Sequence, residues 1–326
     1  MSIRLSHITI SVTTYCNLSC KGCYTRSIGN ETLDINRFTE NILKPFISLG
    51  GRSIGFTGGE PLMYSEIYKL IEIAKQYSLY VSLVTNGTLL NEENAKQLHN
   101  LGLDSLQISL DTFVTEDNDF IRGKGNKANV IKALRCAESW GLSPILVAVP
   151  NKSLYENIDE YIIEAINHHV RSIYLRRRIN KVDNLQLNLD LEFNRDFLVK
   201  IREISKRNTN IRINSGDPLY CVLQYEGTDI NVRKMFAGCS AGINSLAIKA
   251  NGDVIPCTRV DVPIGNVYKE DLRDIWEESP VLHRLRKREL KGECNICKFK
   301  FLCGGCRASA LINKGDIYES DPMCFI

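Results

Sequence analysis

Between residues 7 and 175 the sequence alternates six times between a strand-length apolar run and a segment with the spacing of an amphipathic helix. Successive βα units require parallel strands with covering helices, which predicts an α/β fold built as a partial (β/α)6 barrel. The expected strands are His7–Thr13, Ser53–Phe56, Tyr80–Val84, Ser105–Ser109, Ile145–Val149 and Ser172–Leu175. The expected helices are Asp34–Leu49, Ser65–Tyr77, Glu92–Leu101, Lys127–Trp140 and Tyr155–His168. In such barrels the functional residues lie at the carboxyl ends of the strands.

The composition of the chain changes after about residue 220, where cysteine, glycine and turn signals become frequent. An Asn-Gly pair at 251–252, between two short apolar runs, predicts a β-hairpin. We therefore expect a TIM-like partial barrel over residues 1–220, followed by a small Cys-rich, cluster-binding domain over residues 221–326.

The 326 residues include 12 cysteines and carry a formal net charge of +3. Such a balanced charge does not indicate a nucleic-acid partner. No apolar run approaches the roughly 18 residues of a membrane span, and the segment Met1–His7 lacks the apolar core of a signal peptide. We therefore expect a cytoplasmic protein without a membrane partner, whose clustered thiols bind metal rather than form disulfides.

Three cysteines follow the first expected strand in the spacing C-x3-C-x2-C, at Cys16, Cys20 and Cys23. Three thiolates can hold three irons of a [4Fe–4S] cluster and leave the fourth iron free to bind a small molecule. The alternative is a zinc site, which requires a fourth ligand close by. The position of the motif, at the carboxyl end of a barrel strand, favours the reactive cluster.

This cysteine motif resembles that of the radical SAM superfamily. The resemblance implies that the free iron binds the amino and carboxylate groups of S-adenosylmethionine (SAM). One electron then cleaves SAM to methionine and a 5′-deoxyadenosyl radical, which abstracts a hydrogen atom from the substrate. The chain departs from the family in having Gly22 where an aromatic residue usually precedes the third cysteine, so we assign the adenine contact to Tyr24.

Further motifs of the family stand at the ends of the next three strands. Gly58-Gly59-Glu60 resembles the GGE motif, which implies contact with the amino group of methionine; the alternative is a plain turn before a helix. Polar residues follow, and the resemblance gives them contacts with SAM: Asn86, Ser109 and Asp111 to its ribose and carboxylate, and Arg122 to a carboxylate. Strand ends often carry such polar residues for turn formation alone, and Arg122 is equally explained as a surface residue.

Seven cysteines after residue 238 resemble the SPASM domain, a C-terminal extension of radical SAM enzymes that carries auxiliary iron–sulfur clusters. The resemblance implies three ligands for auxiliary cluster I, Cys239, Cys257 and Cys306, and four for auxiliary cluster II, Cys294, Cys297, Cys303 and Cys324. The gap between Cys303 and Cys306 is one residue shorter than in the family pattern. A pair of zinc knuckles is the alternative.

Two cysteines remain, together with a run of three arginines. Cys136 lies in an amphipathic segment and is explained as a structural thiol. Cys221 has three interpretations: a fourth ligand of auxiliary cluster I, a hydrogen-atom donor to the substrate, or a core residue. Arg176 and Arg178 share one face of the sixth strand, where they suit a carboxylate of SAM or of an acidic substrate; a solvated loop is the alternative.

The resemblance therefore predicts an oxygen-sensitive radical SAM enzyme supplied with electrons by a flavodoxin- or ferredoxin-type reductant. Similar enzymes most often cross-link, epimerise or oxidise ribosomally made peptides. The chain starts directly at its first strand, which leaves no room for the N-terminal peptide-recognition domain of many such enzymes and makes a peptide substrate less favoured; a peptide would then be recognised through a separate protein. The alternatives are a small-molecule enzyme, acting on a carboxylate-rich tetrapyrrole of haem synthesis or on a sugar, and a non-catalytic iron–sulfur or zinc protein.

Overall fold

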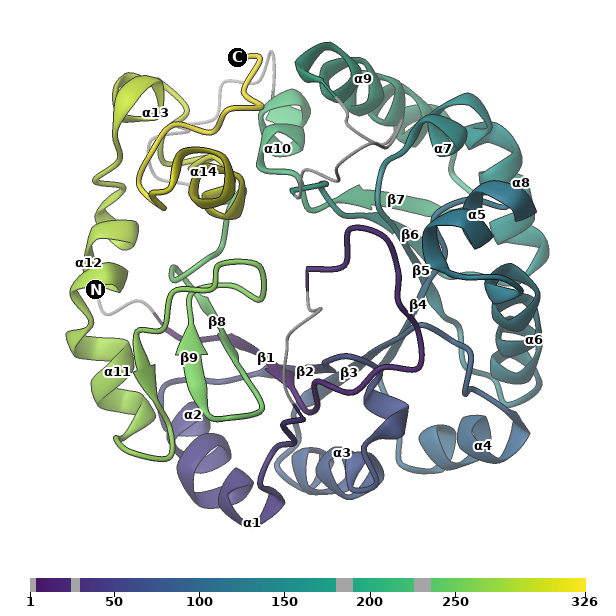
Figure 1. Cartoon of the computed structure of the whole chain (residues 1–326), viewed down its shortest axis with the longest axis horizontal. Helices are drawn as coiled ribbons and strands as arrows, with labels where there is room; N and C mark the ends of the chain where they lie inside the picture. Colours follow the sequence, from purple (N-terminus) through teal and green to yellow (C-terminus); the bar gives the residue numbers. More distant parts are fainter. Residues whose placement is uncertain (1–3, 25–29, 180–189, 226–235) are drawn as a thin grey trace.

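Seven parallel strands form an open arc with helices on its outer side, as Figure 1 shows. The computed structural model describes residues 4–24, 30–179, 190–225 and 236–326. The first seven strands are hydrogen-bonded in the order of the sequence, from β1 to β7, with all neighbours parallel. The partial barrel expected from the alternating pattern is therefore present. No helix within the described residues is both long and apolar enough to cross a bilayer.

The elements agree closely with the expected ranges. The strands are β1 (His7–Ser11), β2 (Ser53–Thr57), β3 (Tyr80–Thr85), β4 (Ser105–Ser109), β5 (Ile145–Ala148), β6 (Ser172–Leu175), β7 (Arg212–Ser215), β8 (Ser245–Ile248), β9 (Asp253–Ile255) and β10 (Gly265–Asn266). The helical segments of the barrel are α1 (Ile35–Arg37), η1 (Phe38–Leu43), α2 (Lys44–Ser48), η2 (Pro61–Met63), α3 (Ile67–Gln76), α4 (Glu92–Asn100), α5 (Thr115–Arg122), α6 (Asn126–Ser139), α7 (Lys152–Glu156), α8 (Ile158–Asn167) and α9 (Leu191–Arg207). Those that follow are α10 (Pro218–Tyr225), α11 (Leu272–Glu278), α12 (Pro280–Lys287), α13 (Gly292–Ile296) and α14 (Arg307–Lys314).

The C-terminal part continues the same sheet. Strands β8 and β9 form the predicted hairpin, and β8 also pairs in parallel with β1, with His7 opposite Ser245. The sheet thus runs in the order β10-β9-β8-β1-β2-β3-β4-β5-β6-β7. In Figure 1 the C-terminal region, green to yellow, lies between the β1 side of the arc and α10. Helix α10 spans the domain boundary that we place between residues 220 and 221, and this boundary stays a prediction.

Alternation along β1 separates an apolar outer face from a polar inner face. Ile8 and Ile10 are fully buried in the core, whereas His7, Thr9 and Ser11 are only partly buried. Because side chains alternate along a strand, the three polar residues share the face opposite to the helices. All three line cavities, so the inner face of this strand is available for polar chemistry.

Candidate functional site

A cavity of about 180 Å³, which we call the barrel cavity, lies at the carboxyl ends of the strands. It brings together most of the residues predicted to hold the first cluster and SAM. These are Cys16, Cys20, Cys23, Tyr24, Gly58, Gly59, Asn86, Ser109, Asp111 and Arg122. They come from the loop after β1 and from the ends of β2, β3 and β4 and the helix α5, so the fold collects them from more than 100 positions of sequence.

The loop that carries the three cysteines is fastened to the end of β2 by backbone contacts. The amide of Gly59 donates to the carbonyl of Thr13 at 2.7 Å, and the amide of Glu60 donates to that of Tyr15 at 2.7 Å. A side chain at Gly59 would collide with the Tyr15 carbonyl, and one at Gly58, whose φ is +152°, would press on Thr13. The two glycines therefore allow the close approach of two backbones, in addition to leaving room in the cavity.

Glu60 is the exception among the predicted SAM-binding residues, because it does not line the barrel cavity. Its fully buried carboxylate accepts hydrogen bonds from the Thr85 hydroxyl (2.7 Å), the Asn86 amide (2.7 Å) and the Leu62 amide (3.1 Å). A carboxylate has about four acceptor positions, so three are filled from within the protein. In this geometry the carboxylate braces the ends of β2 and β3, and its predicted role as acceptor for an ammonium group of SAM stays a prediction.

Asn86 joins the end of β3 to the cysteine loop. Its side-chain amide donates to Asn17 Oδ1 at 2.9 Å and approaches Cys16 Sγ at 3.8 Å. Its own oxygen accepts from the backbone and the hydroxyl of Thr88, and Asn17 donates to the same hydroxyl at 2.8 Å. This network fixes the loop next to a cysteine sulfur. Asn17 and Thr88 were not among the predicted site residues, since neither belongs to a distinctive motif.

Asp111 and Arg122, both predicted to contact SAM, form a bidentate ion pair with each other, with donor–acceptor distances of 2.8 and 3.1 Å. Their side chains are only 2% and 12% exposed, so the interpretation of Arg122 as a surface arginine is wrong. The carbonyl of Arg122 accepts from Cys20 Sγ at 3.7 Å, and the Lys21 amide donates to the carbonyl of Ile121 at 2.8 Å. The ion pair therefore stabilises the end of α5, whose backbone contacts Cys20 and Lys21.

A group of arginines forms the other wall of the barrel cavity. Arg176, Arg177, Arg178 and Arg259 all line it, so the interpretation of residues 176–178 as a solvated loop is wrong. Arg177 is buried and paired with two carboxylates, those of Asp321 and Asp217. Arg259 was not among the predicted residues, because it lies far from the arginine run in sequence and belongs to no motif.

A second cavity, the middle cavity of about 380 Å³, is lined by four thiols: Cys221, Cys239, Cys257 and Cys306. The last three are the predicted ligands of auxiliary cluster I. Cys221 Sγ is directed at the carbonyl of Pro218 at 2.9 Å and is absent from the lining of the barrel cavity. Its position thus matches that of a fourth thiol for this cavity and does not match that of a hydrogen-atom donor beside SAM.

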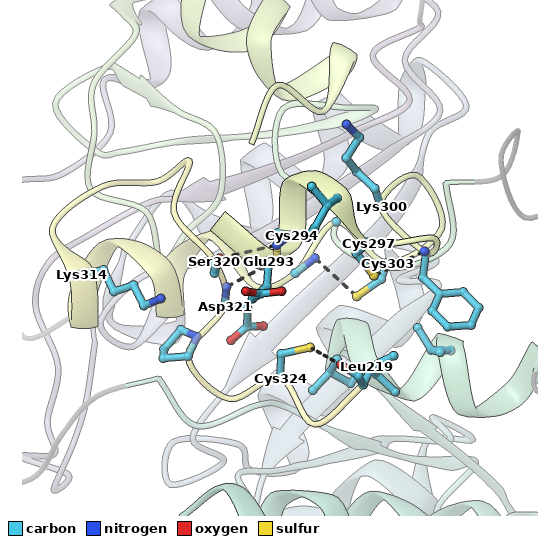
Figure 2. Close-up of a pocket in the computed structure, with 17 residues that line it drawn as sticks. Leu219, Glu293, Cys294, Cys297, Lys300, Cys303, Lys314, Ser320, Asp321 and Cys324 are labelled. Carbon is cyan, nitrogen blue, oxygen red and sulfur yellow. Dashed lines mark hydrogen bonds between the residues drawn. The ribbon is translucent and has the colours of Figure 1, made fainter. Parts of the chain in front are cut away.

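A third cavity, the outer cavity of about 490 Å³, is lined by the four thiols predicted for auxiliary cluster II. Figure 2 shows Cys294, Cys297, Cys303 and Cys324 around it, together with Asp321. The two cavities divide between them the eight cysteines that follow Cys136. Cys136 itself lies on α6 at the edge of the core, in agreement with a structural thiol.

Hydrogen-bond donors point at sulfur atoms in the first cysteine group and in the outer cavity. Backbone amides approach sulfur at 3.4 to 3.5 Å, from Leu18 to Cys16, from Phe299 to Cys297, from Gly305 to Cys303 and from Asp321 to Cys294. Donors of this kind stabilise the negative charge of cluster thiolates. Within the described residues no three His, Cys, Asp or Glu side chains meet at the spacing of a single bound ion. The sets of three or four thiols, together with these amide donors, fit iron–sulfur clusters.

Burial raises the pKa of several of the predicted ligand thiols, so these stay protonated in the absence of metal. It raises the pKa of Cys20 to about 11, that of Cys306 to about 11 and that of Cys221 to about 12. Only thiolates ligate iron, so metal binding has to release these protons.

The ion pair of Arg177 and Asp321 connects the three cavities. Arg177 lines the barrel cavity and Asp321 the outer cavity. Asp321 Oδ2 also accepts from the amide of Cys306, whose thiol lines the middle cavity, at 2.7 Å. The two acids that pair with Arg177, Asp217 and Asp321, were not identified from the sequence, because only the fold brings them next to this arginine.

The comparisons with known proteins agree with this arrangement. A model of the radical SAM superfamily matches residues 10–152, and one of the iron–sulfur cluster-binding domain SPASM matches residues 239–298. The AdoMet-dependent heme synthase of Methanosarcina barkeri is 28% identical over 97% of this chain and 95% of that protein. The PqqA peptide cyclase of Rhizobium meliloti is 26% identical over 95% and 84%.

A solved structure shares the fold. That of Streptococcus suis SuiB bound to S-adenosylmethionine has a TM-score of 0.81 and 23% identity, over 100% of this chain and 78% of that chain. These matches show that the cofactors of the chain are iron–sulfur clusters and SAM. The chain is an enzyme of the radical SAM superfamily that carries a SPASM domain in its C-terminal part.

Proposed function

We propose that the enzyme modifies a carboxylate-bearing substrate, in the first place a ribosomally made peptide, at the barrel cavity. The observation that carries this proposal is the set of Arg176, Arg178 and Arg259 on one wall. In the parts of the chain that the structure describes, none of the three has a carboxylate partner; Arg178 donates to the carbonyl of Pro150 and Arg259 to that of Arg177. SAM brings one carboxylate, so three guanidinium groups leave room for a second anion.

Three groups of residues would hold the cofactors. We assign the SAM-binding cluster to Cys16, Cys20 and Cys23, auxiliary cluster I to Cys221, Cys239, Cys257 and Cys306, and auxiliary cluster II to Cys294, Cys297, Cys303 and Cys324. Reductive cleavage of SAM would supply the radical that abstracts the substrate hydrogen. The chain's own residues would position the reactants. Gly58, Gly59 and Ser109 border the space for SAM, and the partly exposed Tyr24 lies at its edge.

A side cavity of about 370 Å³ supports a peptide as the substrate. It shares Cys23, Tyr24 and Arg259 with the barrel cavity and continues along the β8–β9 hairpin. Its lining combines charged groups, Lys249 and Asp261, with apolar ones from α14. A mixed lining of this kind suits a chain with both backbone and side-chain groups. Relatives and structural neighbours that act on peptides, such as the PqqA peptide cyclase, are in line with this.

A carboxylate-rich tetrapyrrole is the second candidate substrate. The same arginine set favours it, since several carboxylates would then face several guanidinium groups. The similarity to the AdoMet-dependent heme synthase over 97% of the chain points in the same direction. We further propose a flavodoxin- or ferredoxin-type reductant, a separate peptide-recognition protein if the substrate is a peptide, and a cytoplasmic location, where twelve free thiols stay reduced.

Anaerobic formation of 5′-deoxyadenosine from SAM and dithionite tests the activity. A protein that holds about twelve irons, at four per cluster, and yet makes no 5′-deoxyadenosine would overturn the proposal. The substrate class is tested with acidic precursor peptides, analysed by mass spectrometry, and with a tetracarboxylic porphyrin and its methyl ester, whose binding is followed by absorbance. A porphyrin that binds only as the free acid favours the second candidate, and a modified peptide favours the first.

Variants of the arginine wall test the role of the anion. Arg176→Gln and Arg259→Gln are expected to weaken binding of the acidic substrate at least tenfold, about 1.4 kcal/mol each, since one charge-assisted contact is lost. Arg171→Gln is the matched control, because Arg171 is exposed at the other end of β6. Unchanged substrate binding in both wall variants would contradict the carboxylate-binding role while leaving SAM cleavage in place.

A further inference from the structure

A fully buried guanidinium without a matching acid lies between the middle and outer cavities. Arg288, directly after α12, is 0% exposed. Its Nη2 donates to the carbonyl of Cys239 at 2.9 Å, whereas Nε and Nη1 have no hydrogen-bond partner. The titratable groups near it are Cys239, Arg307, Cys303 and Cys221, and no described carboxylate is among them.

This arrangement is incomplete as it stands. An arginine side chain stays protonated in proteins, and a buried charge without a partner costs several kcal/mol. The missing negative charge has to come from the groups around it. Cys239 and Cys221 line the middle cavity and Cys303 lines the outer cavity, so an anionic group bound in either cavity would lie next to residues that surround Arg288, which itself lines neither.

A turn shared by both cavities lies directly against Arg288. Residues Cys303-Gly304-Gly305-Cys306 contribute one thiol to the outer cavity and the other to the middle cavity. Gly304 has a φ of +72°, and a side chain there would collide with the Arg288 guanidinium. The cation is thus held in place by the backbone that links the two sets of ligands.

Arg307, the other arginine next to this turn, differs in its partners. Its guanidinium donates to the carbonyls of Gly305, Ile317 and Glu319 at 2.8 to 3.3 Å and is only 1% exposed. These contacts hold the turn and the C-terminal segment together whether or not a metal group is bound. The guanidinium of Arg288 has only one described hydrogen bond, to the Cys239 carbonyl, and lies over the ring of Phe236 at 5.5 Å from the centroid, so no described group balances its charge.

We propose that Arg288 is a shared counter-cation of the two auxiliary clusters and raises the reduction potential of both. The proposal rests on the cluster ligands assigned above. Each cluster becomes more negative by one charge when it accepts one electron from a reductant, and a fixed cation nearby stabilises that state. The effect is expected to be larger for auxiliary cluster I, because the one described hydrogen bond of the Arg288 guanidinium goes to the carbonyl of Cys239, a predicted ligand of that cluster.

Potentiometric titration of the iron-loaded enzyme, followed by electron paramagnetic resonance, tests this. In Arg288→Met the ratio of reduced to oxidised auxiliary cluster is expected to fall about tenfold at any fixed potential, which equals about 59 mV for a one-electron couple. Arg288→Lys keeps the charge and is expected to shift the ratio much less. Lys287→Met is the matched control: it removes the same charge one residue away, from a side chain that is 72% exposed, and is expected to leave all potentials unchanged.

The outcomes separate this inference from the assignment of the clusters. A wild-type enzyme with about four irons per chain would refute the auxiliary sites themselves. Wild-type potentials in a fully loaded Arg288→Met enzyme would overturn the inference alone. If Arg288→Met loses auxiliary iron, the requirement for charge is supported when Arg288→Lys keeps the iron and the potentials. Equal loss of iron in both variants would show a steric role and also overturn the inference.

Discussion

Asp321 accepts two hydrogen bonds from the guanidinium of Arg177, at 2.6 and 2.7 Å, although 144 positions separate the two residues in sequence. Both side chains are at most 1% exposed. The pair ties the end of β6 to the segment that precedes Cys324. The geometry of the barrel cavity and that of the auxiliary ligands are therefore coupled through one buried contact.

Removal of the acid in this pair is expected to destabilise the C-terminal part. Asp321→Ala leaves Arg177 with Asp217 alone, at 3.3 Å, and takes the acceptor from the Cys306 amide. Breaking a buried pair in this way costs about 3–5 kcal/mol. We expect a loss of that size in the free energy of unfolding, and a loss of auxiliary iron with retention of the SAM-binding cluster, measured by denaturant titration and by iron counting.

Asp316→Ala is the matched control for this variant. Asp316 pairs with Lys291 at 2.7 Å, but the two side chains are 31% and 52% exposed. Such a pair contributes less than about 1 kcal/mol. Equal effects of Asp321→Ala and Asp316→Ala would contradict the coupling described here.

Gly59→Ala is expected to abolish SAM cleavage by displacing the cysteine loop. The added methyl group would meet the carbonyl of Tyr15, which is backbone and cannot turn away. We expect at least a hundredfold lower yield of 5′-deoxyadenosine, about 2.7 kcal/mol, and weaker loading of the first cluster. Gly141→Ala serves as the control, because the methyl group added there meets nothing within 4 Å, although the φ of +68° adds a backbone strain that Gly59 lacks. Full activity of Gly59→Ala would show that the close approach is not required.

Glu60→Gln distinguishes a brace from a direct ligand of SAM. Three donors face the carboxylate, so an amide group in its place leaves at least one buried donor unmatched, at a cost of about 1–3 kcal/mol. We expect lower stability of the SAM-free enzyme in thermal unfolding, with Thr85→Val giving part of the same loss. Glu66→Gln, at an exposed position before α3, is the control. A variant of unchanged stability that no longer binds SAM would instead support the direct contact.

Cys221→Ala tests ligation at the middle cavity. If the thiol is the fourth ligand of auxiliary cluster I, the variant is expected to lose that cluster or change its resonance spectrum, with iron falling from about twelve to about eight per chain. Cys136→Ala is the control and is expected to keep all iron, since this thiol lies on α6 away from the cavities. Full iron with an unchanged spectrum, but with loss of turnover, would favour the hydrogen-donor role.

Local patterns were sufficient to predict most of the barrel. The six strands were found within about two residues of their positions, because each is a short apolar run between helical segments. The same patterns were less informative past the end of a strand. Period-two alternation placed Arg176 and Arg178 on the inner face, but β6 ends at Leu175, and the residue between them, Arg177, also reaches the barrel cavity.

Residues whose roles depend on distant partners were not predictable. Arg259 and Arg288 belong to no motif, and their significance appears only when the fold places them beside the cavities. Asp321 reads as an ordinary turn residue before a proline until Arg177 is seen opposite to it. Likewise, the composition change after residue 220 suggested a separate unit, whereas the pairing of β8 with β1 is a long-range contact that no local signal reports.

The pairing of β8 with β1 also has a consequence for the solubility of the barrel. Without β8, the amides and carbonyls of β1 from His7 to Ile10 would lie unpaired along one side of the sheet, next to buried isoleucines. An uncovered strand edge of this kind is a template for pairing with other chains and thus for aggregation. The cluster-binding region therefore also covers this edge of the sheet. A fragment truncated before residue 245 is expected to aggregate rather than to fold as an independent barrel.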